Sequence, residues 1–197
     1  ISLDYLHGRA GQCLILPFIV TRGVSYGEDI LLGDKGLIRD YPYLPFADDA
    51  IMEFAKYYYG EREYPDAERL YRRVVNEYPR QEWAELARFQ LSESIYRQIR
   101  GADYEEELPL KAEASYRRYL DENPRGQHAE ESRGRLRELA DMQGQSYLNK
   151  ANFYLRESQI AAARMYLRIV LERYTTAPAA EEARELLKQV DGMEARG

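Results

Sequence analysis

Few residues in this chain could do acid–base or metal chemistry, and none of them forms a catalytic pattern. The histidines are His7 and His128, neither in an HExxH motif, and a single cysteine, Cys13, cannot build a cysteine-based zinc site. Acidic pairs such as Asp48 and Asp49 open predicted helices, where carboxylates complement the positive end of the helix dipole. No glycine pattern reads as a phosphate-binding loop. The sequence therefore predicts a protein that is not an enzyme and that needs no cofactor or metal.

The composition favours a protein that binds other proteins. The 197 residues carry a net charge of −6 with no basic block, which argues against nucleic acid as a partner. The chain contains eighteen tyrosines but only five phenylalanines. Tyrosine can fill a helical core with its ring and still place a hydroxyl at the edge, so it also suits a contact surface.

The N-terminal apolar run is too short to cross a bilayer. It extends from Leu14 to Val20 and contains Pro17. Cys13 is a poor lipidation site, because Gln12 precedes it where a lipoprotein signal has Gly or Ala. The chain begins at Ile1 rather than Met, so we expect an upstream segment to have been removed. Membrane contact is therefore expected only through a lipid anchor that this sequence does not contain.

The elements that must carry any function are helical hairpins, and residues 46–79 show the clearest one. Two apolar stripes with helical spacing run through it, and Pro79 ends the second. Pro65 stands at the start of the second helix, where a missing N–H costs nothing. The small residues Ala55 and Ala67 are placed where the two helices cross. The stripes consist of Ile51, Phe54, Ala55 and Tyr58, then Ala67, Tyr71, Val74 and Val75. These types and spacings match a tetratricopeptide (TPR) repeat.

The same pattern returns along the chain, as it must, because one hairpin cannot bury its own apolar face. Ala112, Tyr116 and Tyr119 precede Pro124 as Ala67, Tyr71 and Val74 precede Pro79. A further copy ends in a weakened signal at Tyr174-Thr175. The end signals are Tyr41-Pro42, Tyr78-Pro79, Asn123-Pro124 and Tyr174-Thr175.

Two departures from the 34-residue period are visible. An acidic insertion of about eight residues, ADYEEELP, precedes the predicted helix that starts at Leu110. Residues 128–157 then predict one long helix or two abutting ones, with Gly134 and Gly144 as candidate bends. A returning helix over 158–174 and a last helix after Pro178 complete the chain.

The expected architecture is an all-α, TPR-like solenoid of helical hairpins with a right-handed superhelical twist. We expect about nine helices, arranged over residues 26–190 as about four repeats and a C-terminal capping helix. The first of these repeats, around residues 26–41, is weakened by Gly33 and Gly36. Residues 1–25 carry no repeat signature and are expected to form an irregular segment.

The layout of the C-terminal half resembles one TPR family in particular. Residues 129–155, AEESRGRLRELADMQGQSYLNKANFYL, resemble the long helix of the BamD family, the lipoprotein of the outer-membrane β-barrel assembly complex. Residues 161–183 resemble the repeat and cap that follow it, although Thr175 replaces the usual proline. The resemblance covers about residues 26–190. It implies a scaffold at the periplasmic face of the bacterial outer membrane that binds unfolded outer-membrane proteins and docks on the barrel-forming subunit.

Two binding surfaces are predicted. A groove for an extended client peptide is expected on the helix faces opposite the hairpin core, although packing between repeats would explain the same faces. Its residues are Met52, Lys56, Tyr59, Phe89, Tyr96 and Arg97. A docking surface for a folded partner is expected over residues 128–174, where the repeat spacing changes, because arginine is favoured at interfaces. Its residues are Arg156, Arg164 and Arg168.

Two other functions fit the same patterns. A general TPR adaptor of the cell envelope needs the same hairpins and grooves without the assembly complex. A regulatory subunit of an enzyme would also be non-catalytic and helical. A native upstream segment that ends in a lipidated cysteine would separate the assembly scaffold from the general adaptor.

Overall fold

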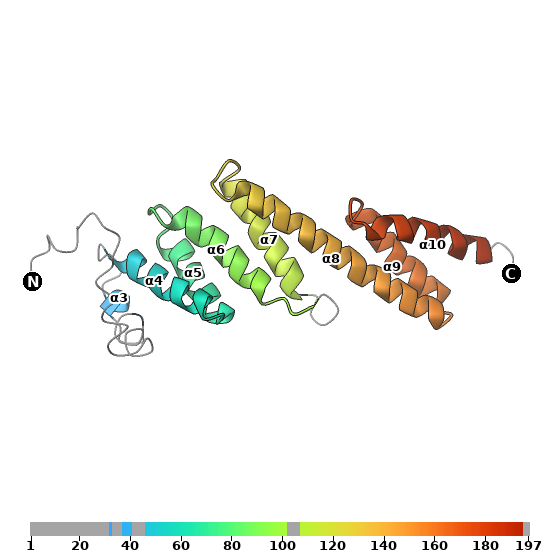
Figure 1. Cartoon of the computed structure of the whole chain (residues 1–197), viewed down its shortest axis with the longest axis horizontal. Helices are drawn as coiled ribbons and strands as arrows, with labels where there is room; N and C mark the ends of the chain where they lie inside the picture. The colour runs from blue at the N-terminus through green and yellow to red at the C-terminus, as the bar shows by residue number, and fades with distance from the viewer. Residues whose placement is uncertain (1–31, 33–36, 41–45, 102–106, 195–197) are drawn as a thin grey trace, which may run out of the picture. The chain divides into compact units, whose positions relative to one another are not determined.

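The computed structural model describes residues 32, 37–40, 46–101 and 107–194, and these residues form α-helices joined by short turns (Figure 1). No strand occurs among them, which confirms the all-α, TPR-like fold. The predicted irregular segment 1–25 and most of the weakened first repeat lie outside the described residues. The helices are α3 (Leu37–Asp40), α4 (Ala47–Gly60), α5 (Tyr64–Glu77), α6 (Ala84–Arg97), α7 (Glu107–Glu122), α8 (Ala129–Arg156), α9 (Ile160–Arg173) and α10 (Ala179–Glu194).

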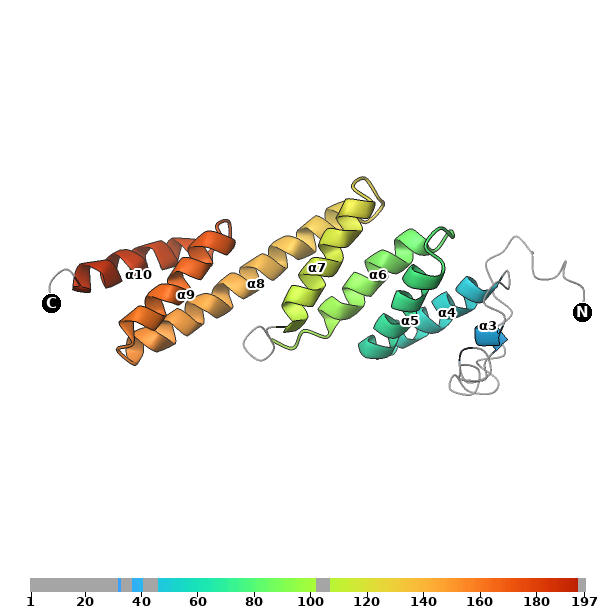
Figure 2. The ribbon, with the colours of Figure 1, turned by 180° about the vertical axis from the view of Figure 1, so that it is seen from behind.

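The chain divides into two compact units, Ile1–Gln98 and Ile99–Gly197. In the first unit α5 packs between α4 and α6, and in the second α8 packs on α7, α9 and α10. Figure 2 shows the same order of helices from behind.

The hairpin of α4 and α5 is built as its sequence predicts. Ala55 and Ala67 are fully buried, and Tyr71 is 1% exposed beside them. Pro65 lies in the first turn of α5, where its missing N–H breaks no helical hydrogen bond. Small side chains at the crossing let the two backbones approach, and the larger Tyr71 fills the space next to them.

The turns inside the hairpins repeat their geometry. In the turn between α4 and α5, Arg62 has a left-handed backbone with φ of 64°, and Ser158 between α8 and α9 has φ of 56°. The amide of the next residue bonds back to the end of the first helix in each case, from Glu63 to Tyr58 and from Gln159 to Tyr154, both at 2.9 Å. α8 therefore ends in the same way as α4.

The turns between hairpins also repeat. In each, the residue after the second helix donates its backbone N–H to the carbonyl four residues earlier, at 2.8–3.0 Å. Six residues later a further backbone N–H donates to the carbonyl three residues before it, at 2.9–3.1 Å, and closes the turn. The closing pairs are Ala84 to Gln81, Ala129 to Gly126 and Ala180 to Ala177. The turn after Tyr174 has this geometry although Thr175 replaces proline.

α8 is one continuous helix of 28 residues, as the apolar pattern predicts. Gly144 within it is needed for close packing. A Cβ at Gly144 would lie 3.1 Å from the Cβ of Ala177 and 3.3 Å from that of Tyr174. The glycine therefore allows the turn before α10 to sit directly on α8.

Replacing Gly144 by alanine is expected to destabilise the protein. Overpacking at this contact costs about 1–3 kcal/mol, while alanine regains about 1 kcal/mol of helix propensity. Gly134→Ala is the matched control, since its Cβ would meet no atom closer than 3.9 Å. Thermal melts should show Gly144→Ala below wild type and Gly134→Ala at or above it. A Gly144→Ala protein as stable as the control would contradict the close packing.

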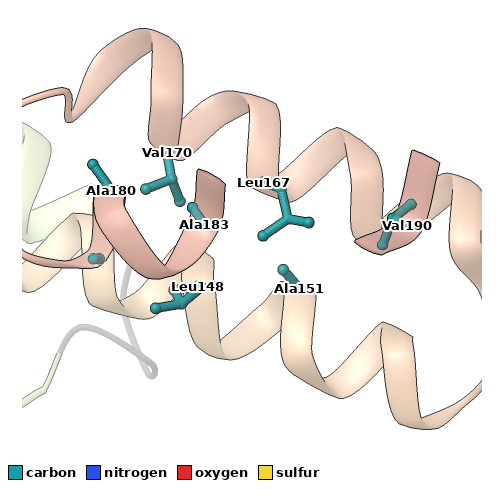
Figure 3. Packing of buried hydrophobic residues seen from close by; sticks show 8 residues of the cluster. Leu148, Ala151, Leu167, Val170, Ala180, Ala183 and Val190 are labelled. Carbon is teal, nitrogen blue, oxygen red and sulfur yellow. The ribbon is translucent and has the colours of Figure 1, made fainter. Parts of the chain in front are cut away.

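The core of the second unit forms where α8, α9 and α10 meet (Figure 3). Leu148 and Ala151 of α8 face Leu167 and Val170 of α9, and all four are fully buried. α10 covers α8 and α9 with Ala180, Ala183 and Val190, which are at most 1% exposed. Short alanine side chains on α10 allow it to approach both helices.

The structure corrects the boundary of the acidic insertion. α7 begins at Glu107, three residues before the predicted start at Leu110. Pro109 lies in the first turn of α7 and is buried, a position where proline does not disturb a helix. The last three residues of the expected insertion are therefore helical, and residues 102–106 lie outside the described residues.

Candidate protein-binding surfaces

Two residues of the predicted groove are buried, so for them the prediction of an accessible surface is wrong. Met52 of α4 is fully buried, and Phe89 of α6 is 3% exposed. Helical periodicity placed both residues away from the crossing of their own hairpin. Individual side chains connect this face of α4 to α6.

Trp83, at the N-terminus of α6, makes this connection. Its indole N–H donates to the carboxylate of Asp49 on α4. The ammonium of Lys56 lies 4.3 Å from the centroid of the same ring, a cation–π contact. Lys56 also pairs with Glu53 at 2.8 Å. The positive charge of Lys56 is therefore already compensated inside the hairpin array.

Tyr59 is the second connection between α4 and α6. Its ring packs edge-on against Tyr64 with centroids 5.4 Å apart. Burial and the negative charge of Glu93 raise the pKa of the Tyr59 phenol, whereas its hydrogen bond with Arg97 opposes that rise. Arg97 lies 3.6 Å from the carboxylate of Glu93, which is only 3% exposed. A buried carboxylate held by an arginine and beside a phenol is well compensated.

The accessible remainder of this surface is polar and aromatic. Lys56, Tyr59 and Tyr96 are half-buried and Arg97 is exposed. These four side chains and their partners present rings, an ammonium and a guanidinium on one side of α4 and α6. The chemistry suits a peptide that offers aromatic or carboxylate groups. We call these four residues the α4–α6 surface.

Sequence reasoning missed Trp83 at this surface. Trp83 lies 34 residues after Asp49, one TPR period, so the period itself could have pointed to that pair. Periodicity places Glu93 on the same face as Tyr96 and Arg97, but it does not predict that Glu93 is buried beside Arg97 and Tyr59. Asp48, considered above for acid–base chemistry, is half-buried at the start of α4. Its pKa is raised by burial and by neighbouring Asp49.

The three arginines predicted to dock a partner do not share one environment. Arg156 and Arg168 are exposed, on α8 and α9. Arg164 donates to Asp191 of α10 at 3.0 Å, and its side chain is only 19% exposed. Its prediction as an exposed residue is therefore wrong, because α10 covers that side of α9. Arg164 ties the capping helix to the hairpin.

Comparable ties recur where a second helix of a hairpin meets the following first helix. Gln98 donates to the carboxylate of Glu68 at 2.7 Å, and Gln143 donates to that of Glu113 at 3.3 Å. Both pairs are 30 residues apart. The second helices α5 and α7 thus each present a carboxylate to the next helix along the chain.

The described residues contain no group of three or more His, Cys, Asp or Glu side chains that could hold a metal ion. None of the described helices combines the length and the apolar character that a bilayer crossing needs. The surfaces described above are the candidate protein-binding surfaces of the described residues.

Repeated hairpins, shared turn geometry and aromatic contact faces define a protein of the TPR-like, helical-hairpin class, whose members act by binding other proteins. The model of one family, YfiO, described as an outer membrane lipoprotein, matches residues 35–193. The chain belongs to this YfiO family of outer membrane lipoproteins, which is non-enzymatic and implies protein partners. No curated protein matches the chain.

Proposed function

We propose that this protein is a non-enzymatic scaffold of the outer-membrane β-barrel assembly machinery, anchored as a lipoprotein at the periplasmic face of the outer membrane. It binds unfolded segments of outer-membrane proteins and docks on the barrel-forming subunit. The observation that carries this proposal is the match to a family of outer membrane lipoproteins over residues 35–193. The division of the described helices into two units is consistent with two separate binding tasks. The organisation of residues 26–190 as about four repeats and a cap is part of the same proposal.

The client segment is assigned to the α4–α6 surface. Unfolded outer-membrane proteins carry aromatic side chains and a terminal carboxylate. The Tyr59 and Tyr96 rings match the aromatic side chains, and the carboxylate would compete with Glu53 for Lys56 or with Glu93 for Arg97. Because the client must become ordered on binding, the affinity is about micromolar. Met52 and Phe89 support this surface from beneath rather than contacting the client.

Replacing Tyr59 and Tyr96 together with alanine is expected to weaken client binding about tenfold or more, since one aromatic hot spot contributes roughly 2 kcal/mol. The measurement is a fluorescence titration with a C-terminal client peptide, compared with a scrambled peptide. Tyr57→Ala is the matched control, because Tyr57 lies on α4, is 41% exposed and belongs to another face. Equal binding of both peptides, or unchanged binding by the double variant, would show that the client does not bind at this surface.

The folded barrel subunit is assigned to the second unit through Arg156 and Arg168. Both guanidinium groups are exposed, and arginine combines charge with a planar face suited to interfaces. Arg164 contributes indirectly, by holding α10 against α9.

Arg156→Glu with Arg168→Glu is expected to reduce binding of the barrel subunit's periplasmic domains by at least about tenfold in a quantitative pull-down. Arg164→Glu alone should weaken docking by loosening α10, and exchange of the pair as Arg164→Asp with Asp191→Arg should restore it. Wild-type affinity in the double variant would place docking elsewhere. Failure of the exchanged pair to restore binding would instead make Arg164 a direct contact.

A further inference from the structure

α8 has the length of two first helices placed end to end. It starts after the same kind of turn as α6, and it ends in the same kind of turn as α4. α4 and α6 contain 14 residues each, and α8 contains 28. In a regular array a second helix separates two first helices. Inside α8 the chain continues without one, so none of the described helices fills one second-helix position along α8.

The filled position lies along the N-terminal half of α8. The Tyr119 hydroxyl of α7 accepts from the backbone N–H of His128, and Glu113 accepts from Gln143. These bonds tie α7 to the stretch between residues 128 and 143. In both views α7 lies beside the first half of α8 and α9 beside the second half (Figure 1, Figure 2). Gln143 marks the junction, because it also accepts from the Tyr174 hydroxyl at 2.9 Å.

The corresponding flank of the second half is found by a shift of 14 residues. Ser132 and Leu136, near the start of α8, correspond to Ser146 and Lys150, and Ala140 corresponds to Tyr154. Ser146 is 6% exposed next to the junction, while Lys150 and Tyr154 are half-buried. The flank that α7 packs on thus continues into a surface of different chemistry.

Stacked tyrosines form this surface. The Tyr154 and Tyr166 rings are nearly parallel with centroids 5.3 Å apart, and Tyr147 lies 6.2 Å from Tyr166. Tyr147 also stacks on Tyr174 at 5.7 Å. Tyr147, Tyr154 and Tyr166 are half-buried, so the row keeps an accessible edge. Stacked rings form a rigid apolar surface that loses little entropy on binding.

Two cations flank the row. The Lys150 ammonium lies 5.1 Å from the Tyr147 ring centroid, and the Arg173 guanidinium lies 5.6 Å from that of Tyr174. A partner seated on the tyrosines would meet positive charge on the same surface.

We propose that this tyrosine row, Tyr147, Tyr154 and Tyr166 with Lys150 and Arg173, binds one acidic amphipathic helix of a partner protein in the unfilled second-helix position. Two observations select this occupant. The surface continues the flank on which α7 packs, which favours a helix. The Lys150 ammonium and the Arg173 guanidinium lie against the Tyr147 and Tyr174 rings, and this positive charge favours acidic side chains on the helix.

This site differs from the proposed docking arginines. Asn152 and Arg164 contact α10 through Glu182 and Asp191. Tyr154 lies two residues after Asn152, about 200° around the helix, and therefore on the other flank of α8. The inference does not rest on the proposed function, and the two are tested by different variants.

The test uses a synthetic helical peptide of the length of α7, 16 residues, with a leucine stripe flanked by glutamates. A second peptide carries lysines in place of the glutamates. We expect the acidic peptide to bind the full chain at least about tenfold more tightly in fluorescence anisotropy. Lys150→Glu with Arg173→Glu should remove that preference, and Arg156→Glu with Arg168→Glu should keep it. If the charge-reversal variant does not fold, Lys150→Gln with Arg173→Gln replaces it and should also remove the preference for the acidic peptide.

Other outcomes would overturn the proposal. Equal affinity for the two peptides, no binding of the acidic one, or unchanged binding in the Lys150 and Arg173 variants would each contradict it. Sedimentation of the chain alone would also contradict it if dimers form and are lost with Lys150→Glu, since the occupant would then be a second copy. NMR shift changes confined to α10 would contradict the assigned flank.

Discussion

Replacing Tyr71 by alanine is expected to lower the free energy of unfolding by about 3–5 kcal/mol, the range for truncating a large buried aromatic. Tyr71 is 1% exposed, and it fills the space beside the crossing of α4 and α5, where Ala55 and Ala67 are fully buried. Burial also raises the pKa of its phenol well above the ordinary value. The alanine variant leaves a cavity that these small neighbours cannot fill.

Urea melts followed by circular dichroism measure this loss. Tyr57→Ala is the matched control, since Tyr57 is 41% exposed and packs edge-on against Tyr58 at 5.6 Å. The control should change the free energy of unfolding by less than about 1 kcal/mol. An unchanged midpoint for Tyr71→Ala would show that the core of the first hairpin has been assigned wrongly.

Leu167→Ala is expected to cost about 2–5 kcal/mol, because it truncates a fully buried aliphatic residue. Leu167 occupies in α9 the place of Tyr71 in α5, four residues after the alanine at the crossing. It lies at the meeting point of α8, α9 and α10 (Figure 3), so the loss should loosen the capping helix as well as the hairpin.

Met165→Ala on the same helix is the control, since Met165 is 50% exposed and should be nearly neutral. Hydrogen exchange adds a local readout, because Leu167→Ala should reduce protection in α8, α9 and α10. Equal stability of the Leu167 and Met165 variants would contradict the shared core of these helices.

The hairpins could be predicted because their signals are local. Ala55, Ala67, Tyr71 and Pro79 combine small crossing residues, a helical period and a stop within one repeat. The length of α8, 28 residues, could be predicted equally well, since no proline interrupts its apolar pattern before Pro178. The start of α7 was missed because Pro109 reads as a breaker unless it is known to lie in a first turn.

The site could be predicted only in part, because periodicity tells which face a residue occupies but not what covers that face. Met52 and Phe89 lie away from their own crossing, yet both are buried. Trp83 bridges from α6 to Asp49, and this contact depends on the spacing of two helices.

Charge posed a similar problem. Arg164 was predicted to be exposed like Arg168. It pairs instead with Asp191 of α10, which lies 27 residues further along the chain. The tyrosine row is also hidden in the sequence. Tyr147, Tyr154 and Tyr166 each match core positions of a repeat, yet all three are only half-buried.

The most direct test of the central claim is quantitative mass spectrometry of the lipidated, full-length protein purified from outer membranes in mild detergent. The account predicts a stoichiometric complex with the barrel-forming assembly subunit, which Arg156→Glu with Arg168→Glu reduces by at least about tenfold. Recovery of the protein from outer membranes without that subunit, at wild-type expression, would contradict the claim that it is a scaffold of the β-barrel assembly machinery.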